Sequence, residues 1–121
     1  MTFEQLKEKI GTADPADWHQ HKNGGGWIHA SARVDESAIV GKDAIVWGIV
    51  SGDARVSGNA QVSGDAWVSG NAQVYGDAWV YGNARVYGNA RVYGKLKLLK
   101  GNFFSIRYQK EEIKFEKIDE N

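Results

Sequence analysis

Aliphatic residues recur at every sixth position over most of the chain. One series begins at Val50 and continues to Leu98, and an earlier one runs from Ile28 to Val46. The two series are out of phase, because only four residues separate Val46 from Val50 at the segment VWGI. Apolar positions of an amphipathic helix recur about every 3.6 residues. A period of six therefore excludes a helix and predicts a short strand and a turn, repeated many times.

The repeated unit is the six-residue word Val-x-Gly-Asp/Asn-Ala-x. In a strand, valine faces one side and its two neighbours face the other. Glycine adopts positive φ freely, and Asn and Asp tolerate it better than most residues, so Gly-Asp/Asn predicts the turn. Alanine is small enough to lie inside the corner. The word predicts a coil with valine and alanine inside and two side chains per word outside.

Words such as VSGNAR, which cover Ile28 to about Leu99, resemble those of the hexapeptide-repeat family. In that family glycine often follows the aliphatic residue directly, whereas here it stands two places later. The resemblance implies a left-handed winding with three words per triangular coil, so that residues 18 apart are stacked. We predict an all-β protein, a single-stranded left-handed parallel β-helix of about four coils, over residues 27–99. Residues 1–26 are predicted as an N-terminal helical cap and 100–121 as a C-terminal hairpin or tail.

The segments at the two ends lack the repeated word. In residues 2–10, Phe3, Leu6 and Ile10 share one face of a predicted α-helix, and Thr2 with Gln5 has the spacing of a capping box. Asp14 and Pro15 are typical of the start of a second, short helix, and the segment HKNGGG is expected to be a loop leading into the first strand. Alternating apolar residues beyond Gly94 predict a β-hairpin, with a C-terminal helix as the alternative.

Stacking by 18 residues sorts the outward side chains into three faces, if the shortened segment VWGI preserves the order of the faces. The face built around Ile28, Val46 and Val62 carries three of the five tryptophans and no acidic residue. A flat aromatic strip of this kind indicates an interface. The alternative is that the N-terminal helices or the tail cover this face within one chain. The predicted interface residues are Trp27, His29, Ile45, Trp47, Trp79, Tyr81 and Leu99.

Asp and Asn alternate at the fourth letter of the word. Because the number of words per coil is odd, this alternation never stacks one Asp directly on another. Like charges about 5 Å apart repel, whereas adjacent Asp and Asn side chains can form a hydrogen bond. We therefore expect a structural role for this position. Calcium-binding repeats have a nine-residue period and a different glycine spacing, which disfavours that alternative.

The composition of the chain excludes several classes of function. The chain has fifteen basic and fifteen acidic residues and no cysteine, so disulfides, thiolate catalysis and thiolate metal sites are excluded. A neutral chain lacks the basic stripe that nucleic-acid binding needs. No apolar run approaches the roughly 18 residues of a membrane helix, and the charged N-terminus does not resemble a secretory signal. We expect no nucleic-acid or membrane partner and a cytoplasmic location.

Catalysis is not expected. The three histidines, His19, His21 and His29, lie at or before the first strand. Enzymes of the resembled family include acyltransferases, with a catalytic histidine near a subunit interface, and zinc-dependent carbonic anhydrases. The anhydrases have histidine ligands in later coils, where this chain has other residues. We predict no catalytic residue, no metal site and no cofactor.

The favoured function is a non-enzymatic binding or scaffold protein that forms a dimer or trimer. Words such as GNARVYG after the segment GGW resemble small repeat proteins of bacteria and phages. This resemblance implies a phage-encoded protein that blocks or sequesters a host defence component, with a host protein or a small molecule as partner. The location would then be the host cytoplasm. The alternative is an acyltransferase-like trimer with a ligand site between subunits.

Overall fold

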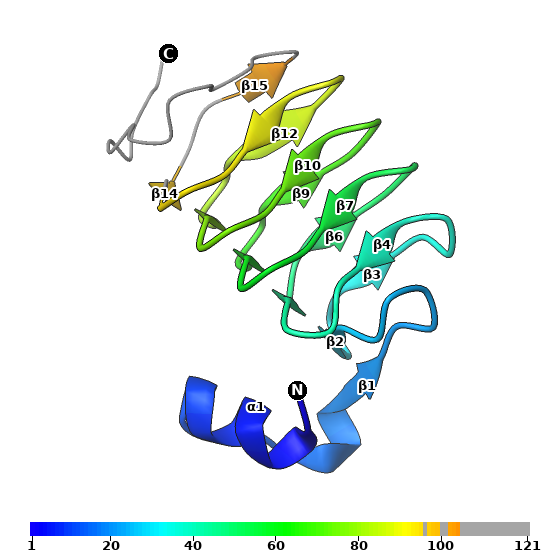
Figure 1. The fold of residues 1–121 in the computed structure, drawn as a ribbon, viewed down its shortest axis with the longest axis vertical. Helices are drawn as coiled ribbons and strands as arrows, with labels where there is room; N and C mark the ends of the chain where they lie inside the picture. The colour runs from blue at the N-terminus through cyan, green and yellow to red at the C-terminus, as the bar shows by residue number, and fades with distance from the viewer. Residues whose placement is uncertain (96, 100–101, 105–121) are drawn as a thin grey trace.

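The computed structural model describes residues 1–95, 97–99 and 102–104. The chain winds into a column whose successive short strands fall into three sheets (Figure 1). The first sheet contains, in spatial order, β1 (Trp18–Gln20), β2 (Trp27–His29), β5 (Ile45–Val46), β8 (Gln61–Val62), β11 (Trp79–Val80) and β14 (Lys97–Leu98). The second contains β3 (Arg33–Val34), β6 (Ile49–Val50), β9 (Trp67–Val68), β12 (Arg85–Tyr87) and β15 (Asn102–Phe104). The third contains β4 (Ile39–Val40), β7 (Arg55–Val56), β10 (Gln73–Val74) and β13 (Arg91–Val92).

All neighbouring strands are parallel, except that β1 is antiparallel to β2. The protein is thus a parallel β-solenoid of about four turns with a short N-terminal helix, which confirms the predicted fold class. The left-handed sense of winding stays a prediction. None of the helices in the described residues is long and apolar enough to cross a membrane.

The strand register follows the predicted stacking. Val62 pairs with Val80, 18 residues later, whereas Val46 pairs with Val62 after only 16. The same shortening separates Val34 from its partner Val50. The contraction at VWGI therefore shortens one coil and leaves the order of the three faces unchanged, which is the condition under which the outward side chains were sorted into faces.

The core is a stack of valine and alanine side chains, one of each per word. Every repeat valine from Val40 to Val92 and every repeat alanine from Ala38 to Ala90 is fully buried. Burial of one valine side chain contributes about 1.5–3 kcal/mol. Between coils, backbone N–H groups donate to the carbonyls of the next coil, as from Ser57 to Val74 at 2.9 Å. Small side chains inside and a continuous hydrogen-bond ladder together account for the strictness of the word.

Gly58 shows why each corner needs glycine. Its φ is +65°, a conformation that costs L-residues energy. A Cβ atom at this position would also lie 2.9 Å from the nitrogen of Gly76 in the next coil. Positive φ and the close approach of stacked corners therefore both select glycine.

The N-terminal helix α1 (Phe3–Ile10) begins as predicted. The Gln5 backbone N–H donates to Thr2 Oγ1 at 3.1 Å, and the Thr2 N–H donates to Gln5 Oε1 at 2.9 Å, which completes the capping box. A short 3-10 helix, η1 (Pro15–Asp17), follows Asp14, whose Oδ1 accepts from the Ala16 N–H at 3.0 Å. Both start signals in the sequence are confirmed.

The segment HKNGGG forms a turn that leads into β2, as predicted, and the strand β1, which the sequence did not predict, comes before it. The turn packs along β4 at the free edge of the third sheet. There Gly26 N–H donates to Val40 O at 2.8 Å, and Val40 N–H donates to Asn23 O at 3.1 Å. The buried His21 donates from Nε2 to Ala38 O at 2.9 Å. These bonds satisfy backbone groups that an open sheet edge would leave unpaired.

At the opposite end, β15 extends the second sheet and pairs in parallel with β12. The sequence predicted a hairpin or tail over residues 100–121. Most of that range, residues 100–101 and 105–121, lies outside the described residues.

Candidate interaction surface

The register of the first sheet brings the predicted interface residues into two outward columns. Strand pairing aligns Trp27 with Ile45, Gln61 with Trp79, and Trp79 with Lys97. The second column consists of the residues that follow the central aliphatic of each strand. Its members are His29, Trp47, Ser63, Tyr81 and Leu99.

The N-terminal part of this strip is covered by the chain itself. Ile45 is fully buried and Trp27 is only 8% exposed, both packed with Leu6 and Trp18. Trp27 Nε1–H also donates to Met1 O at 2.8 Å. The expectation that Trp27 and Ile45 belong to an exposed face is therefore wrong, because the apolar face of α1 needs burial and these two side chains supply it.

Trp47 and His29 lie at the edge of this covered region. The Trp47 ring packs edge-on against Trp18, with 5.2 Å between ring centroids, and is half-buried. The His29 ring lies 5.0 Å from Trp18, and its Nδ1 accepts from the Ser31 backbone N–H at 3.1 Å. Both residues contact the N-terminal segment, so they do not form a free surface like the one higher on the sheet.

Higher on the first sheet the strip is exposed. Trp79 and Leu99 are each 39% exposed, and Tyr81 is half-buried. Trp79 and Tyr81 pack edge-to-face, with centroids 6.4 Å apart, and Lys97 Nζ lies 4.6 Å from the Trp79 ring centroid. We call Trp79, Tyr81 and Leu99 the exposed ridge.

Between the covered region and the ridge, small side chains leave a shallow hollow of about 470 Å³. Gln61 and Ser63, on and just after β8, take the outward positions that tryptophan and tyrosine occupy one coil further on. The residues that line this first-sheet hollow are Ser31, Trp47, Gln61, Ser63 and Gly64. A ridge and a hollow thus lie side by side on one face.

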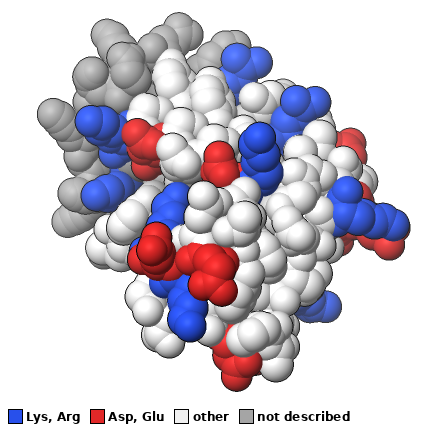
Figure 2. Space-filling model, turned by 60° about the horizontal axis from the view of Figure 1, so that its bottom comes forward, with Lys and Arg blue, Asp and Glu red and all other residues white. Residues whose placement is uncertain are grey.

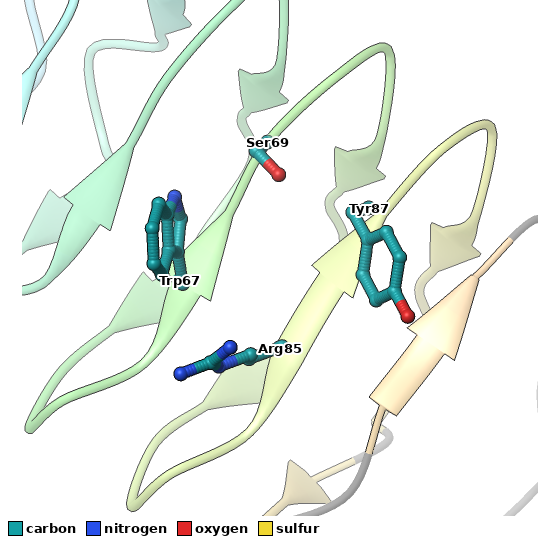
Figure 3. A pocket seen from close by; sticks show the side chains of 4 residues that line it. All are labelled: Trp67, Ser69, Arg85 and Tyr87. Atoms are coloured by element: carbon teal, nitrogen blue, oxygen red, sulfur yellow. The ribbon is translucent and has the colours of Figure 1, made fainter.

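The second sheet carries an exposed tryptophan that the predicted site left out. Trp67 is 38% exposed, and the guanidinium carbon of Arg85 lies 5.3 Å from its ring centroid. Together with Ser69 and Tyr87 these residues line a hollow of about 300 Å³ (Figure 3). Stacking by 18 residues places Trp67 beside Arg85, but the first-sheet face was predicted as the interface because that face carries more tryptophans.

The third sheet has a simpler surface. Tyr75 and Tyr93 stack in parallel on successive coils, with centroids 5.1 Å apart and ring planes 6° from coplanar. No group of three His, Cys, Asp or Glu side chains in the described part of the chain is placed to hold a metal ion.

Comparison with known proteins supports the repeat architecture. Residues 50–64, 60–76, 72–86 and 84–95 match the family model described as the YdcK beta solenoid repeat. No curated protein and no solved structure matches the chain. The repeat match and the stacked coils together define the chain as a β-solenoid repeat protein.

Proposed function

We propose that the protein is a non-enzymatic scaffold that self-associates through its first sheet. The observation that carries this proposal is the exposed ridge, because Trp79 and Leu99 remain exposed on the sheet whose Trp27 and Ile45 are covered. Exposed apolar surface of this kind commonly marks an interface between proteins.

The occupant we propose for this surface is a second copy of the chain. In a two-fold symmetric contact the same patch meets itself, so the ridge of one copy faces the hollow of the other, twice. The ridge offers two aromatic rings, and the hollow, of about 470 Å³, is lined by short polar side chains and the edge of Trp47. This arrangement favours a dimer over a trimer.

Trp79→Glu tests the proposal. A charge in the contact is expected to shift the full-length protein to a single chain in size-exclusion chromatography with light scattering, with an unchanged circular dichroism spectrum. Trp67→Glu is the matched control, because Trp67 occupies the same letter of the word, is equally exposed, and lies on the second sheet. An unchanged mass for Trp79→Glu, or the same shift in both variants, would contradict the proposal.

The positions of the histidines support a role without catalysis. His21 is bonded to Ala38 O, and His29 accepts from Ser31, both at the end of the column remote from the ridge. The resemblance to small bacterial and phage repeat proteins extends the proposal to a phage-encoded module that sequesters a host component in the cytoplasm. Pull-down from a host lysate with the native chain and Trp79→Glu tests this extension, which requires a protein captured by the native chain alone.

A further inference from the structure

The charge of the chain changes at the start of the last full coil. In the lower coils, the corners carry Asp53, Asp65 and Asp77, but no acidic residue occurs between Asp77 and Glu111. Figure 2, which brings the N-terminal end forward, shows acidic and basic side chains next to each other there. The described residues after Asp77 carry four cations and no acid: Arg85, Arg91, Lys95 and Lys97. Asp77 itself lies beside two of them, because it lines one hollow together with Lys95 and Lys97.

Arg85 lines a hollow whose other described lining residues include no acid, whereas the two lysines share theirs with Asp77. Its guanidinium lies over the ring of Trp67, the residue paired with it one coil below. Figure 3 shows the Arg85 side chain pointing toward Trp67, with Ser69 and Tyr87 further along the same two strands. A cation–π contact restrains the guanidinium and leaves its N–H groups available for hydrogen bonds.

The hollow beside Arg85 has the size and polarity for a side chain of a partner. Its volume is about 300 Å³, and the described residues that line it are one cation, two hydroxyl-bearing residues and one indole. No acidic residue is among them. Arginine forms strong, often bidentate hydrogen bonds with carboxylates, and a serine hydroxyl such as that of Ser69 can donate another.

We propose that this second-sheet hollow binds a carboxylate side chain from an acidic segment of a partner protein. Arg85 supplies the charge-assisted hydrogen bonds, and Trp67 holds the guanidinium in place. This goes beyond self-association, because the hollow lies on another sheet and does not use the exposed ridge.

Single-stranded nucleic acid fits this surface less well. Such binding combines a positively charged path along the backbone with free aromatic faces on which bases stack. Here Asp53, Asp65 and Asp77 interrupt the positive charge along the lower coils. Arg85 lies over the ring of Trp67, and Lys97 lies over the ring of Trp79. An acidic protein segment needs neither a long basic path nor a free indole.

Fluorescence anisotropy of a fluorescein-labelled octaglutamate peptide, titrated with the full-length protein, tests the proposal. Arg85→Gln should weaken binding of the peptide about tenfold, because the variant loses the charge pair between Arg85 and a glutamate. Arg55→Gln is the matched control: it removes an exposed arginine from the same letter of the word, two residues after Asp53, and should change the affinity by less than about twofold. Circular dichroism checks that both variants are folded.

Three results would overturn the inference. One is no binding of the peptide by the native protein. Another is equal weakening by Arg85→Gln and Arg55→Gln, which indicates nonspecific charge attraction. The third is tighter binding of labelled octathymidylate than of octaglutamate. Trp79→Glu should leave peptide affinity unchanged, so failure here is distinguishable from failure of the self-association proposal.

Discussion

Trp27 and Trp79 occupy equivalent places in the same outward column, yet one is buried and the other is exposed. Both precede the central aliphatic residue of a first-sheet strand, but Trp27 is 8% exposed and Trp79 is 39% exposed. The difference comes from α1, whose Phe3 and Leu6 pack in one cluster with Trp27, whereas Trp79 is not part of that cluster. The repeat sets where a side chain lies and in which direction it points. Segments outside the repeat decide whether it is available to a partner.

The two ends of the column also differ in how far their apolar side chains are covered. At the N-terminal end, the helix, β1 and the turn around Gly26 cover both the apolar strip and a sheet edge. The described part of the upper coils keeps three large exposed apolar side chains: Trp67, Trp79 and Leu99. We infer that the N-terminal end stabilises the fold and that the upper coils carry its contacts.

Uncovering Trp27 would abolish the contrast between the two tryptophans. Leu6→Asp puts a charge into the fully buried position that holds α1 on the strip. It is expected to lower the free energy of unfolding by about 3–5 kcal/mol and to red-shift tryptophan emission. Urea unfolding followed by fluorescence measures both. Leu99→Asp, at an exposed leucine, should cost less than about 1 kcal/mol; comparable losses in the two variants would refute the covering role of α1.

The glycines at the corners of the coils lie closer to their neighbours than the glycine at the end of α1 does. Gly58→Ala is expected to lower the free energy of unfolding by about 2–3 kcal/mol. The positive φ disfavours alanine, and its Cβ would lie 2.9 Å from the nitrogen of Gly76. Gly11, at the end of α1, also has positive φ, but a Cβ at this position would meet none of the described residues within 4 Å. Gly11→Ala should therefore cost only about 1 kcal/mol. Thermal unfolding compares the two, and equal costs would show that stacking adds nothing.

Substitutions in the stacked Asp and Asn columns should have the smallest effect on the free energy of unfolding. Asn59 Nδ2 donates to Asp77 Oδ1 in the next coil at 3.3 Å. Asn59→Asp replaces this bond with like charges and should cost about 1 kcal/mol at low salt, less in 1 M NaCl. Asn89→Asp adds the same charge above Asn71 and should cost much less. Denaturant midpoints at two salt concentrations measure the difference; equal and salt-independent losses would exclude charge repulsion.

The periodic part of the fold was predictable because it depends on local, repeated rules. The spacing of the valines predicted the three faces, and the glycines predicted the corners. Thr2 and Gln5 together predicted the start of α1. Burial of Trp27 was only one of two alternatives, because it depends on where a nonperiodic helix packs. The available signal was the apolar face of Phe3, Leu6 and Ile10, which needed a partner at that end of the column. Neither the strand β1 nor the bond from His21 to Ala38 O had a sequence signal that distinguished it from a loop.

Trp67 illustrates a different limit. Its stacking partner Arg85 follows from the 18-residue spacing, but the hollow beside them depends on side-chain conformations that spacing does not determine. A count of tryptophans per face therefore favoured the first sheet and passed over an exposed residue on the second. Charge along the column is the sequence feature that distinguishes this region.

The most direct test of the central claim is the mass of the native full-length chain, measured by size-exclusion chromatography with light scattering over a wide concentration range. Association through the exposed ridge predicts a mass of two chains that falls toward one on dilution. A mass of three chains would contradict the two-fold arrangement. A mass of one chain at every concentration would contradict self-association.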